Sequence, residues 1–461
     1  MSPEDPSPAR EHPGVQAYAR HVNPTLVKLL GVYGYGRAFV RARDVWVWDH
    51  TGRRYLDALA CFGAANLGHN HPRIIARLKR HLDEEHLNFV HVGPSVHQGA
   101  LAARLVEDTG PSLDVALFSN SGAEAVEGGL KLARAATGRS GLAYCAGGYH
   151  GTTLGTLSIL GTARMRRPFE PLLGGCVELP FGDLGALKKA LEAKRLAAFI
   201  VDPGLCEMGA LEPPAGYLAE AQALCTRYGT VLVLDEVQVG LGRTGTLFAY
   251  QQEGFVPDVL CLAKSLSGAV APIACTVTGS ALHARAFGSL DRYDAHFSTF
   301  GGNAFSCAAA HETLEVLRDE GLPERSRALG AWLLGALRAR LDGHPLVRAV
   351  RGRGLFLAVE LGPTDKGWVS RLAPGVVEGV ARTMFGQWAA VRLLERGVLC
   401  QPASQHWNVL KVVPPLTLQR AEAETLVDAF AEVLGEYQGV GAVLKDVTGR
   451  LGRQFRAGWS F

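Results

Sequence analysis

Short, almost wholly apolar runs recur through the middle of the chain, and each ends in turn-forming or charged residues. They occupy residues 114–120, 141–147, 197–203, 230–236 and 258–264. Consecutive apolar positions over this length are typical of strands buried on both faces of a sheet. Helical patterns separate the runs, so the sequence predicts an α/β fold with a mainly parallel sheet wound by helices.

The two ends of the chain differ from the middle. Valine and tryptophan alternate over 45–48 before Asp49, and a Thr-Gly turn follows at 51–52, which predicts a hairpin. A Leu-, Arg- and Ala-rich helix is expected at 325–341, followed by a strand within RGRGLFLAVEL at 351–361. The domains we expect are a flexible tail at 1–24, the N-terminal part of a small α+β domain at 25–75, a large domain at 76–320 and the remainder of the small domain at 321–461.

Composition narrows the class of protein. The 461 residues carry a formal net charge of +3, too small to indicate a nucleic-acid or acidic-membrane partner. No stretch of about 18 apolar residues is present, and the N-terminus MSPEDPSPAREHPG lacks the apolar core of a signal peptide. The 9 cysteines are dispersed without a CxxC pair, which fits reduced thiols. We therefore expect a cytoplasmic protein.

Residues with reactive side chains follow the predicted strands. Ligands of open α/β sheets bind beyond the carboxyl ends of the strands, so these positions form the candidate site. Ser121 and Glu124 form a capping-box pattern at the start of a helix, and Gly122 leaves the backbone bare there. Free backbone N–H groups at such a helix start bind anions, although a plain capped helix explains the same pattern.

Two further strand ends carry Lys264 and Asp235. A lysine at the end of a buried strand is unfavourable unless it is paired or used covalently, and the neutral amine attacks carbonyls to form a Schiff base. A lysine that reaches solvent is the alternative. A carboxylate at Asp235 suits the ring nitrogen of a pyridine cofactor, which it keeps protonated. Glu236 is expected to point to the opposite face and to be structural.

Several motifs together resemble the class III aminotransferases, which are fold-type I enzymes that use pyridoxal 5′-phosphate (PLP). In chain order they are FGAANLGHNHP, SGAEAVEGGLKLARA, YHGTT, LVLDEVQVGLGRTGTLF, PDVLCLAKSLSG and HFSTFGGNAFSC. The resemblance spans residues 26–430. It implies a large PLP-binding domain at 76–320 and transfer of an amino group between an amine donor and an aldehyde or keto acid.

The resemblance also implies roles for individual residues. Lys264 carries the PLP aldehyde as a Schiff base and then moves a proton between substrate and cofactor. Asp235 pairs with the pyridine nitrogen, and Gln238 approaches the ring hydroxyl. Tyr149 stacks on the ring with His150 beside it.

The phosphate group of PLP has its own set of implied contacts. Ser121, Gly122 and Ala123 hold it at the helix start. Thr299 matches a residue that reaches the phosphate of a neighbouring subunit. The resemblance therefore implies a homodimer with active sites at the interface.

Departures from the family pattern bear on the substrate. Thr152 replaces the arginine of YHGRT, and Asp202 replaces a glutamate, while Glu207 is kept. Family members that act on α-amino acids carry an arginine where this chain has Lys411, and a lysine lacks the bidentate fork for a carboxylate. The segment 367–397 looks longer than usual, as a helical lid or a deeper pocket would require.

These departures favour a terminal amine or aldehyde substrate, as in the putrescine and ω-amine branch or among biosynthetic enzymes that aminate an aldehyde. Phe62 is expected to add an apolar wall, with Glu207 and Lys411 completing the substrate contacts. An ornithine- or acetylornithine-like α-amino acid:2-oxoglutarate aminotransferase is the alternative, as is a PLP-dependent aminomutase or decarboxylase. No metal is expected, because His69 and His71 lack a third ligand at a suitable spacing.

Overall fold

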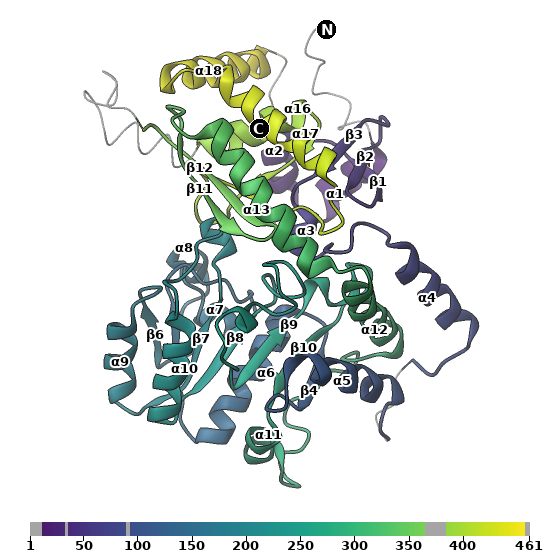
Figure 1. Ribbon diagram of the computed structural model, residues 1–461, viewed down its shortest axis with the longest axis vertical. Helices are drawn as coiled ribbons and strands as arrows, with labels where there is room; N and C mark the ends of the chain where they lie inside the picture. The colour runs from purple at the N-terminus through teal and green to yellow at the C-terminus, as the bar shows by residue number, and fades with distance from the viewer. Residues whose placement is uncertain (1–11, 33–35, 89–92, 365–383, 457–461) are drawn as a thin grey trace.

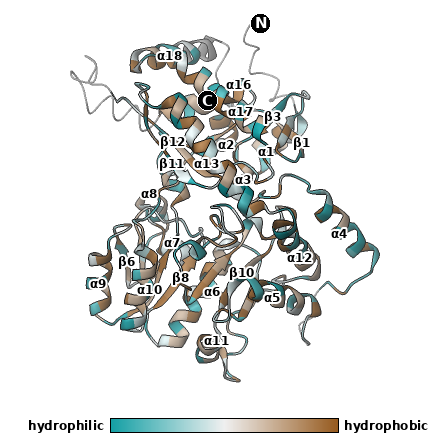
Figure 2. Cartoon of the chain, in the orientation of Figure 1, coloured by the Kyte–Doolittle hydropathy of each residue, from teal (hydrophilic) through white to brown (hydrophobic). Residues whose placement is uncertain are grey.

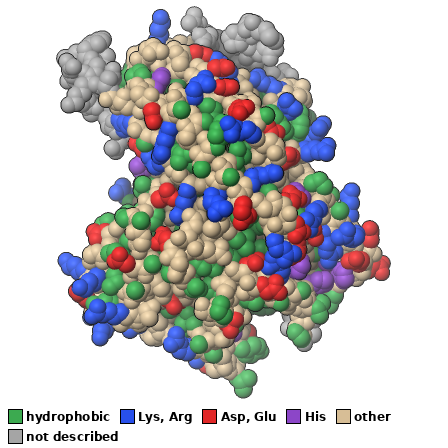
Figure 3. All heavy atoms as spheres, viewed as in Figure 1, with side chains coloured by type: hydrophobic (Ala, Val, Ile, Leu, Met, Phe, Trp, Pro, Cys, Tyr) green, Lys and Arg blue, Asp and Glu red, His purple; other side chains and the backbone are tan. Residues whose placement is uncertain are grey.

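The computed structural model describes residues 12–32, 36–88, 93–364 and 384–456 of the chain. A large sheet with its helices forms one end of the molecule, and two small sheets with the last helices form the other (Figure 1). Within the described residues, no helix is both long and apolar enough to span a membrane. Acidic and basic side chains are interspersed over the face shown in Figure 3.

The large sheet has seven strands. In spatial order they are β4 (Val115–Ser119), β10 (Ala274–Thr278), β9 (Val259–Leu262), β8 (Val231–Asp235), β7 (Leu196–Val201), β5 (Gly141–Cys145) and β6 (Cys176–Leu179). Five of them (β4, β5, β7, β8 and β9) fall on the predicted apolar runs. Only β10 runs antiparallel to its neighbours β4 and β9, and the other pairs are parallel. The predicted mainly parallel α/β sheet is confirmed.

Apolar side chains cover both faces of this sheet. On β8, Leu232 and Leu234 join one buried cluster, whereas Val231 and Val233 join another, as the strand period of two requires. The central strands are largely brown in Figure 2. The covering helices are α5 (Val96–Thr109), α6 (Gly122–Thr137), α9 (Leu184–Glu192), α10 (Tyr217–Tyr228), α11 (Ser280–Phe287) and α12 (Ala304–Asp319).

Shorter elements lie between these strands and helices. They are α4 (Pro72–Asp83), α7 (Leu154–Ser158), α8 (Ala163–Arg166), η2 (Arg167–Phe169), η3 (Cys206–Met208), η4 (Ala249–Gln252) and η5 (Lys264–Ser267). Several of them directly follow a strand of the large sheet, at the edge where chemistry was expected.

The other end of the molecule combines both chain ends. One sheet has the order β1 (Phe39–Arg43), β2 (Trp46–Asp49), β3 (Arg54–Asp57) and β13 (Val398–Leu399). The second has the order β11 (Val347–Arg353), β12 (Phe356–Leu361), β15 (Val409–Val412) and β14 (Gln401–Pro402). Its helices are α13 (Leu322–Leu341), α16 (Gly386–Glu395), α17 (Arg420–Gly435) and α18 (Val440–Arg456). The antiparallel pairing of β2 with β3 confirms the predicted hairpin.

The N-terminal region is more structured than predicted. Residues within the expected flexible tail form α1 (Pro13–His21), and α2 (Pro24–Val32) follows. Proline at the first position of α1 and a hydrogen bond from the Gly14 N–H to His12 Nδ1 (3.1 Å) explain why a helix starts there. The charge- and proline-rich composition of this region led us to expect a flexible tail and no helix there.

Arg243 ties the two ends of the molecule together. Its guanidinium is fully buried and donates hydrogen bonds to the Leu355 carbonyl (2.9 Å), the Pro414 carbonyl and the Asn66 side chain. Burial lowers the pKa of Arg243 to about 10. Because these acceptors come from distant parts of the chain, one side chain joins the large sheet's loops to both small sheets.

Candidate active site

The start of α6 is an open helix terminus behind β4. The Ser121 hydroxyl accepts a hydrogen bond from the Glu124 N–H (3.2 Å), which confirms the predicted cap. The Glu124 carboxylate accepts hydrogen bonds from the Asn120 N–H (2.8 Å) and from the Ser121 hydroxyl (3.2 Å). A side chain at Gly122 would place its Cβ 2.8 Å from Val237, so only glycine allows this close packing. The first N–H groups of α6 remain available for an anion.

Asp235 ends β8 and lies in a buried group with His150 and Asp202. One Asp235 oxygen is 2.7 Å from His150 Nδ1, and the other accepts from the Val237 N–H (3.0 Å). Asp202, which follows β7, approaches His150 Nε2 at 3.7 Å. Neither His150 Nε2 nor the facing Asp202 oxygen has a hydrogen-bond partner among the described residues.

The three side chains of this group shift one another's pKa values: the carboxylates attract a proton to His150 but repel each other. Burial opposes the charged form of His150, but the carboxylates of Asp202 and Asp235 outweigh it and raise the pKa of the imidazole. Burial raises the pKa of Asp202 to about 7, and the negative charge of Asp235 acts in the same direction. The three side chains are close enough to one another to hold a cation. However, the hydrogen bond of 2.7 Å between His150 Nδ1 and Asp235 already occupies one possible ligand atom of each residue.

Glu236 points away from this group, as expected for the next residue on a strand. Its carboxylate accepts hydrogen bonds from the Ala249 N–H (2.6 Å) and the Tyr250 N–H (2.8 Å). Burial raises its pKa to about 7. Glu236 therefore holds the start of η4 in place.

Lys264 lies one residue past Ala263, at the start of η5. Its backbone has φ 48°, a left-handed conformation that is uncommon for a side chain of this size. Burial lowers the pKa of its ammonium, and the charge of Lys411 acts in the same direction, although Asp235 and Glu207 oppose it. Among the described residues none forms an ion pair with Lys264, so its amine is available for chemistry.

Tyr149 and Phe62 are the exposed aromatic residues of the site. Tyr149 is 36% exposed and directly precedes His150. Phe62 is 45% exposed, and its carbonyl accepts a hydrogen bond from Gln238 Nε2 (3.0 Å). Phe62 belongs to α3 (Ala60–Gly63), in which every residue has positive φ. Such backbone strain is typical of functional sites.

Glu207 and Lys411 form a buried ion pair. The Lys411 ammonium donates to a Glu207 oxygen at 2.8 Å, and the other oxygen accepts from the Ser404 N–H at 2.9 Å. Burial raises the pKa of Glu207, but the Lys411 charge outweighs it and holds that pKa below its usual range. The ammonium also lies 5.0 Å from the centre of the Phe62 ring. The predicted substrate contacts Phe62, Glu207 and Lys411 thus meet in space.

Thr299 lies apart from these contacts, in an exposed segment before α12. Its neighbour Ser298 accepts a hydrogen bond from the Asn120 side chain (2.7 Å), which places the segment beside the start of α6.

His69 and His71 each pair with a carboxylate. His69 lies 2.7 Å from Asp57, and His71 lies 3.2 Å from Glu320. Most of the expected segment 367–397 falls on residues 365–383, outside the described residues, and α16 covers its end.

Two contacts of the site were not predicted from the sequence. One is the approach of Asp202 to His150, and the other is the hydrogen bond from the Ser404 N–H to Glu207. Asp202 was a candidate from its place at a strand end, but nothing in the sequence gave its partner. The Ser404 contact depends on a backbone group, for which no side-chain signal exists.

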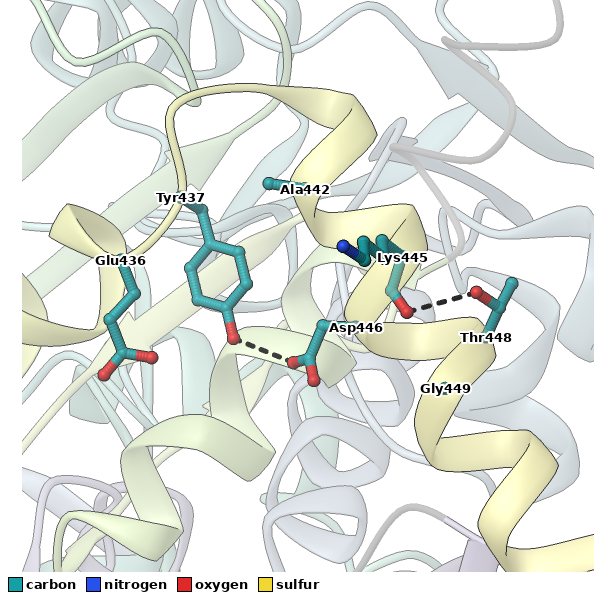
Figure 4. A pocket seen from close by; sticks show the side chains of 7 residues that line it. All are labelled: Glu436, Tyr437, Ala442, Lys445, Asp446, Thr448 and Gly449. Carbon is teal, nitrogen blue, oxygen red and sulfur yellow. Dashed lines mark hydrogen bonds between the residues drawn. The ribbon is translucent and has the colours of Figure 1, made fainter.

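A hollow beside α18 is the alternative location for a site (Figure 4). Its lining includes Tyr437 and Asp446, and the tyrosine hydroxyl donates to that carboxylate at 2.8 Å. The Trp388 indole donates to the same carboxylate at 3.1 Å. These polar groups serve to dock α18, and none of the predicted site residues lines the hollow.

The residues at the carboxyl ends of the strands fit PLP. The open start of α6 suits the phosphate, and the buried Asp235 suits the ring nitrogen, with its charge braced by His150. Tyr149 offers a ring face, and Lys264 offers an amine whose neutral form is favoured by burial. No residue of this group would have to be replaced to accept the cofactor.

The comparison with protein families gives one match over most of the chain. The family described as aminotransferase class-III matches residues 34–434. Two curated relatives are each 36% identical to this chain. They are the aminotransferase PigE of a Serratia species, over 93% of this chain and 54% of that protein, and the ornithine aminotransferase of an Exiguobacterium species, over 85% and 92%. The chain therefore spans about half the length of PigE.

A solved structure agrees with this match. The ornithine aminotransferase of Toxoplasma gondii has a TM-score of 0.80 and 31% identity, over 91% of this chain and 93% of that one. The large mixed sheet wound by helices is the fold-type I architecture of these enzymes. The chain belongs to the class-III aminotransferases and is a PLP-dependent transaminase.

Proposed function

We propose that this enzyme takes the amino group from a terminal amine and passes it to a carbonyl acceptor. The observation that supports this is the buried pair of Glu207 and Lys411. An α-amino acid donor brings a carboxylate beside the reacting carbon, and that charge needs a cation. Lys411 is the cation at the matching position, but Glu207 already neutralises it. An uncharged substituent beside the reacting carbon therefore suits this site better.

The site residues would divide the work as follows. When bound, PLP supplies an electron-withdrawing ring that stabilises a carbanion at the carbon bearing the amino group. Asp235 would hold the positive charge at the ring nitrogen, Gln238 would serve the ring hydroxyl, and Tyr149 would cover the ring face. Lys264 Nζ takes the proton from the donor carbon and returns it. Burial keeps a larger fraction of this amine neutral and thus able to accept a proton.

The apolar side of the substrate is set by Phe62. Its ring lies against the Lys411 ammonium and remains partly exposed, so it presents an apolar wall next to a neutralised charge. PigE and the ornithine aminotransferase are equally identical to this chain, so sequence identity alone does not choose the substrate.

The test uses the visible absorption spectrum of the holoenzyme with one donor at a time. Primary amines and diamines are expected to bleach the absorption band, and an α-keto acid is expected to restore it. An enzyme bleached only by α-amino acids would contradict the proposal. Conversion of the donor to an isomer, or release of carbon dioxide with the amino group retained, without any need for a keto acid would point instead to an aminomutase or a decarboxylase.

Substitution Glu207→Gln should change the donor preference. The variant leaves the Lys411 charge free for a substrate carboxylate, so kcat/KM for alanine relative to butylamine should rise by about tenfold or more. The ratio is the readout because a loss of stability on breaking a buried pair lowers both values together. Glu207→Asp, which keeps the charge, is the control, and an unchanged ratio in Glu207→Gln would contradict the proposed role.

We further propose that the active enzyme is a homodimer in which Thr299 serves the partner's cofactor. The segment around Thr299 exposes large apolar side chains, with Leu290 at 95% and Tyr293 at 70%. Sedimentation equilibrium should give roughly twice the 49.2 kDa of one chain. Leu290→Asp with Tyr293→Asp should yield monomers that bind PLP more weakly, and monomers with unchanged PLP affinity would refute this arrangement.

A further inference from the structure

We propose that His81, His86 and His97 form a binding site for one zinc-like transition-metal ion, separate from the PLP site. The ion would join the end of α4 to the start of α5. Imidazole nitrogens are ligands that zinc takes in proteins, and copper, nickel and iron ions share this preference. Such a site would serve the stability of the fold and not the transfer of the amino group.

The three imidazole rings are close neighbours where α4 ends and α5 begins. The ring centres lie 4.9 Å apart for His81 and His86, 4.8 Å for His86 and His97, and 5.6 Å for His81 and His97. A tetrahedral zinc ion with bonds of about 2.0–2.1 Å to imidazole nitrogens places the ring centres about 5 Å apart. The rings therefore have the spacing that a shared metal ion requires.

The orientation of the rings differs from that of a metal-bound set. His81 and His86 stack with their planes 28° apart, whereas the plane of His97 stands at 80° to that of His86. Among the described residues, only the group around His150 presents three ligand atoms within 4.8 Å of one another. Metal binding therefore requires a ring of the histidine cluster to turn, and the His86 side chain, 35% exposed, has the room to do so.

His81 supplies a nitrogen that has no partner inside the fold. The residue is 2% exposed, and its Nδ1 makes no hydrogen bond with the described residues. Buried polar atoms are seldom left unpaired. The ring of Phe305 on α12 lies 6.0 Å away, edge to face, and offers this nitrogen no hydrogen-bonding atom. A bond to a metal ion would account for the missing hydrogen bond.

Glu84 determines which nitrogen His86 can offer. His86 Nε2 lies 2.8 Å from a Glu84 oxygen, and this hydrogen bond holds the pKa of the carboxyl group below its usual range. An ionised carboxylate only accepts hydrogen bonds, so Nε2 carries the hydrogen and Nδ1 of the neutral ring keeps its lone pair. Metal-bound histidines commonly donate their other N–H to a carboxylate in this way.

The charges around the cluster also suit a metal ion. Burial lowers the pKa of His81 and of His97, and the neighbouring His86 acts in the same direction, although Glu84 opposes both. The two rings therefore favour the neutral form, which is the form that binds metals. The positive charge of Arg77, which would repel a metal ion, is balanced by its ion pair with Glu84 at 3.5 Å.

The position of the cluster indicates what a bound ion would do. The helices α4 and α5 both pack against α12. Figure 3 shows histidine side chains gathered at the edge of the molecule where α4 lies in Figure 1. An ion with ligands from α4, from the chain after it and from α5 would hold the two helices together. Because it binds only the folded chain, it would stabilise the fold by mass action.

The test titrates the holoenzyme with Zn²⁺ and follows binding by calorimetry. We expect about one ion per chain at the cluster, with a dissociation constant in the micromolar range or below. Mg²⁺, which prefers oxygen ligands, should not bind there. In His86→Gln and His97→Gln the Zn²⁺ affinity should fall by at least about tenfold, and in Glu84→Gln by about tenfold. His86 is exposed and His97 is half-buried, so these variants avoid the buried His81 and should fold.

The half-buried His283 on α11 provides the matched control, and His283→Gln should leave Zn²⁺ binding unchanged. As a second measurement, Zn²⁺ should raise the melting temperature of the wild type and of His283→Gln but not that of His97→Gln. Equal Zn²⁺ affinity in the wild type, His86→Gln and His97→Gln would overturn the site. An equal loss of affinity in His283→Gln would overturn it as well.

Discussion

Replacement of Lys264 by alanine should remove the visible absorption band that the lysine amine gives with PLP, and it should abolish the aminotransferase activity. The substitution removes both the amine that anchors the cofactor and the group that moves the proton. Loss of a general base alone costs about 10²- to 10⁴-fold in rate, and loss of the anchor adds to it. The absorption spectrum after addition of PLP and the rate with a saturating amine donor measure the two effects separately.

The exposed Lys188 on α9 provides the control for this experiment. Lys188→Ala should retain both the absorption band and the activity. If the band persisted in Lys264→Ala and disappeared on substitution of another lysine, the assignment of the anchor would be wrong. The left-handed backbone and the burial of Lys264 would then need a purely structural explanation.

Replacement of Asp235 by asparagine should reduce kcat by about 10²- to 10³-fold, the usual cost of removing one preorganised electrostatic partner. The amide cannot hold a proton on the ring nitrogen, so the cofactor becomes a weaker electron sink. The loss of charge beside His150 should also lower the pKa of that imidazole, because Asp235 is one of the groups that raise it. The measurements are kcat, the PLP dissociation constant and the titration of His150 by NMR.

Glu236→Gln is the contrasting variant, because its side chain lies next in sequence and points to the other face of β8. It should destabilise the fold by about 1–3 kcal/mol through the weakened bonds to η4. It should leave the His150 titration unchanged. If both variants changed the His150 titration equally, the pKa of His150 would depend on the total charge near the end of β8 and not on its direct contact with Asp235.

The large sheet and its reactive strand ends could be predicted because they depend on short-range pattern. The run 231–234 is apolar at every position before the acid, and this alone indicates a strand buried on both faces. The carboxyl ends of parallel strands then meet at one edge, which places Asp235 and Lys264 in the same region.

The pairings between side chains could not be predicted in the same way. Glu207 and Lys411 were both selected, yet nothing in the sequence indicated that two residues separated by 204 positions would neutralise each other. Their contact depends on how β15 of the small sheet is placed against η3, which is decided by tertiary packing. The same holds for Asp202 and His150, whose separation of 3.7 Å reflects the length of the side chain at one strand end.

The buried Arg243 has a consequence for how substrates enter and leave. Its hydrogen bonds to Asn66, Leu355 and Pro414 are buried away from water. Separating the two ends of the molecule would break these bonds and leave N–H donors of a charged guanidinium without acceptors. Each unpaired donor would cost about 1–3 kcal/mol, and more because the group is charged. Hinge opening is thus disfavoured in every catalytic cycle. Ligand exchange is expected to occur by rotation of exposed side chains of the site such as Phe62, so the opening that they leave would limit the width of the substrate.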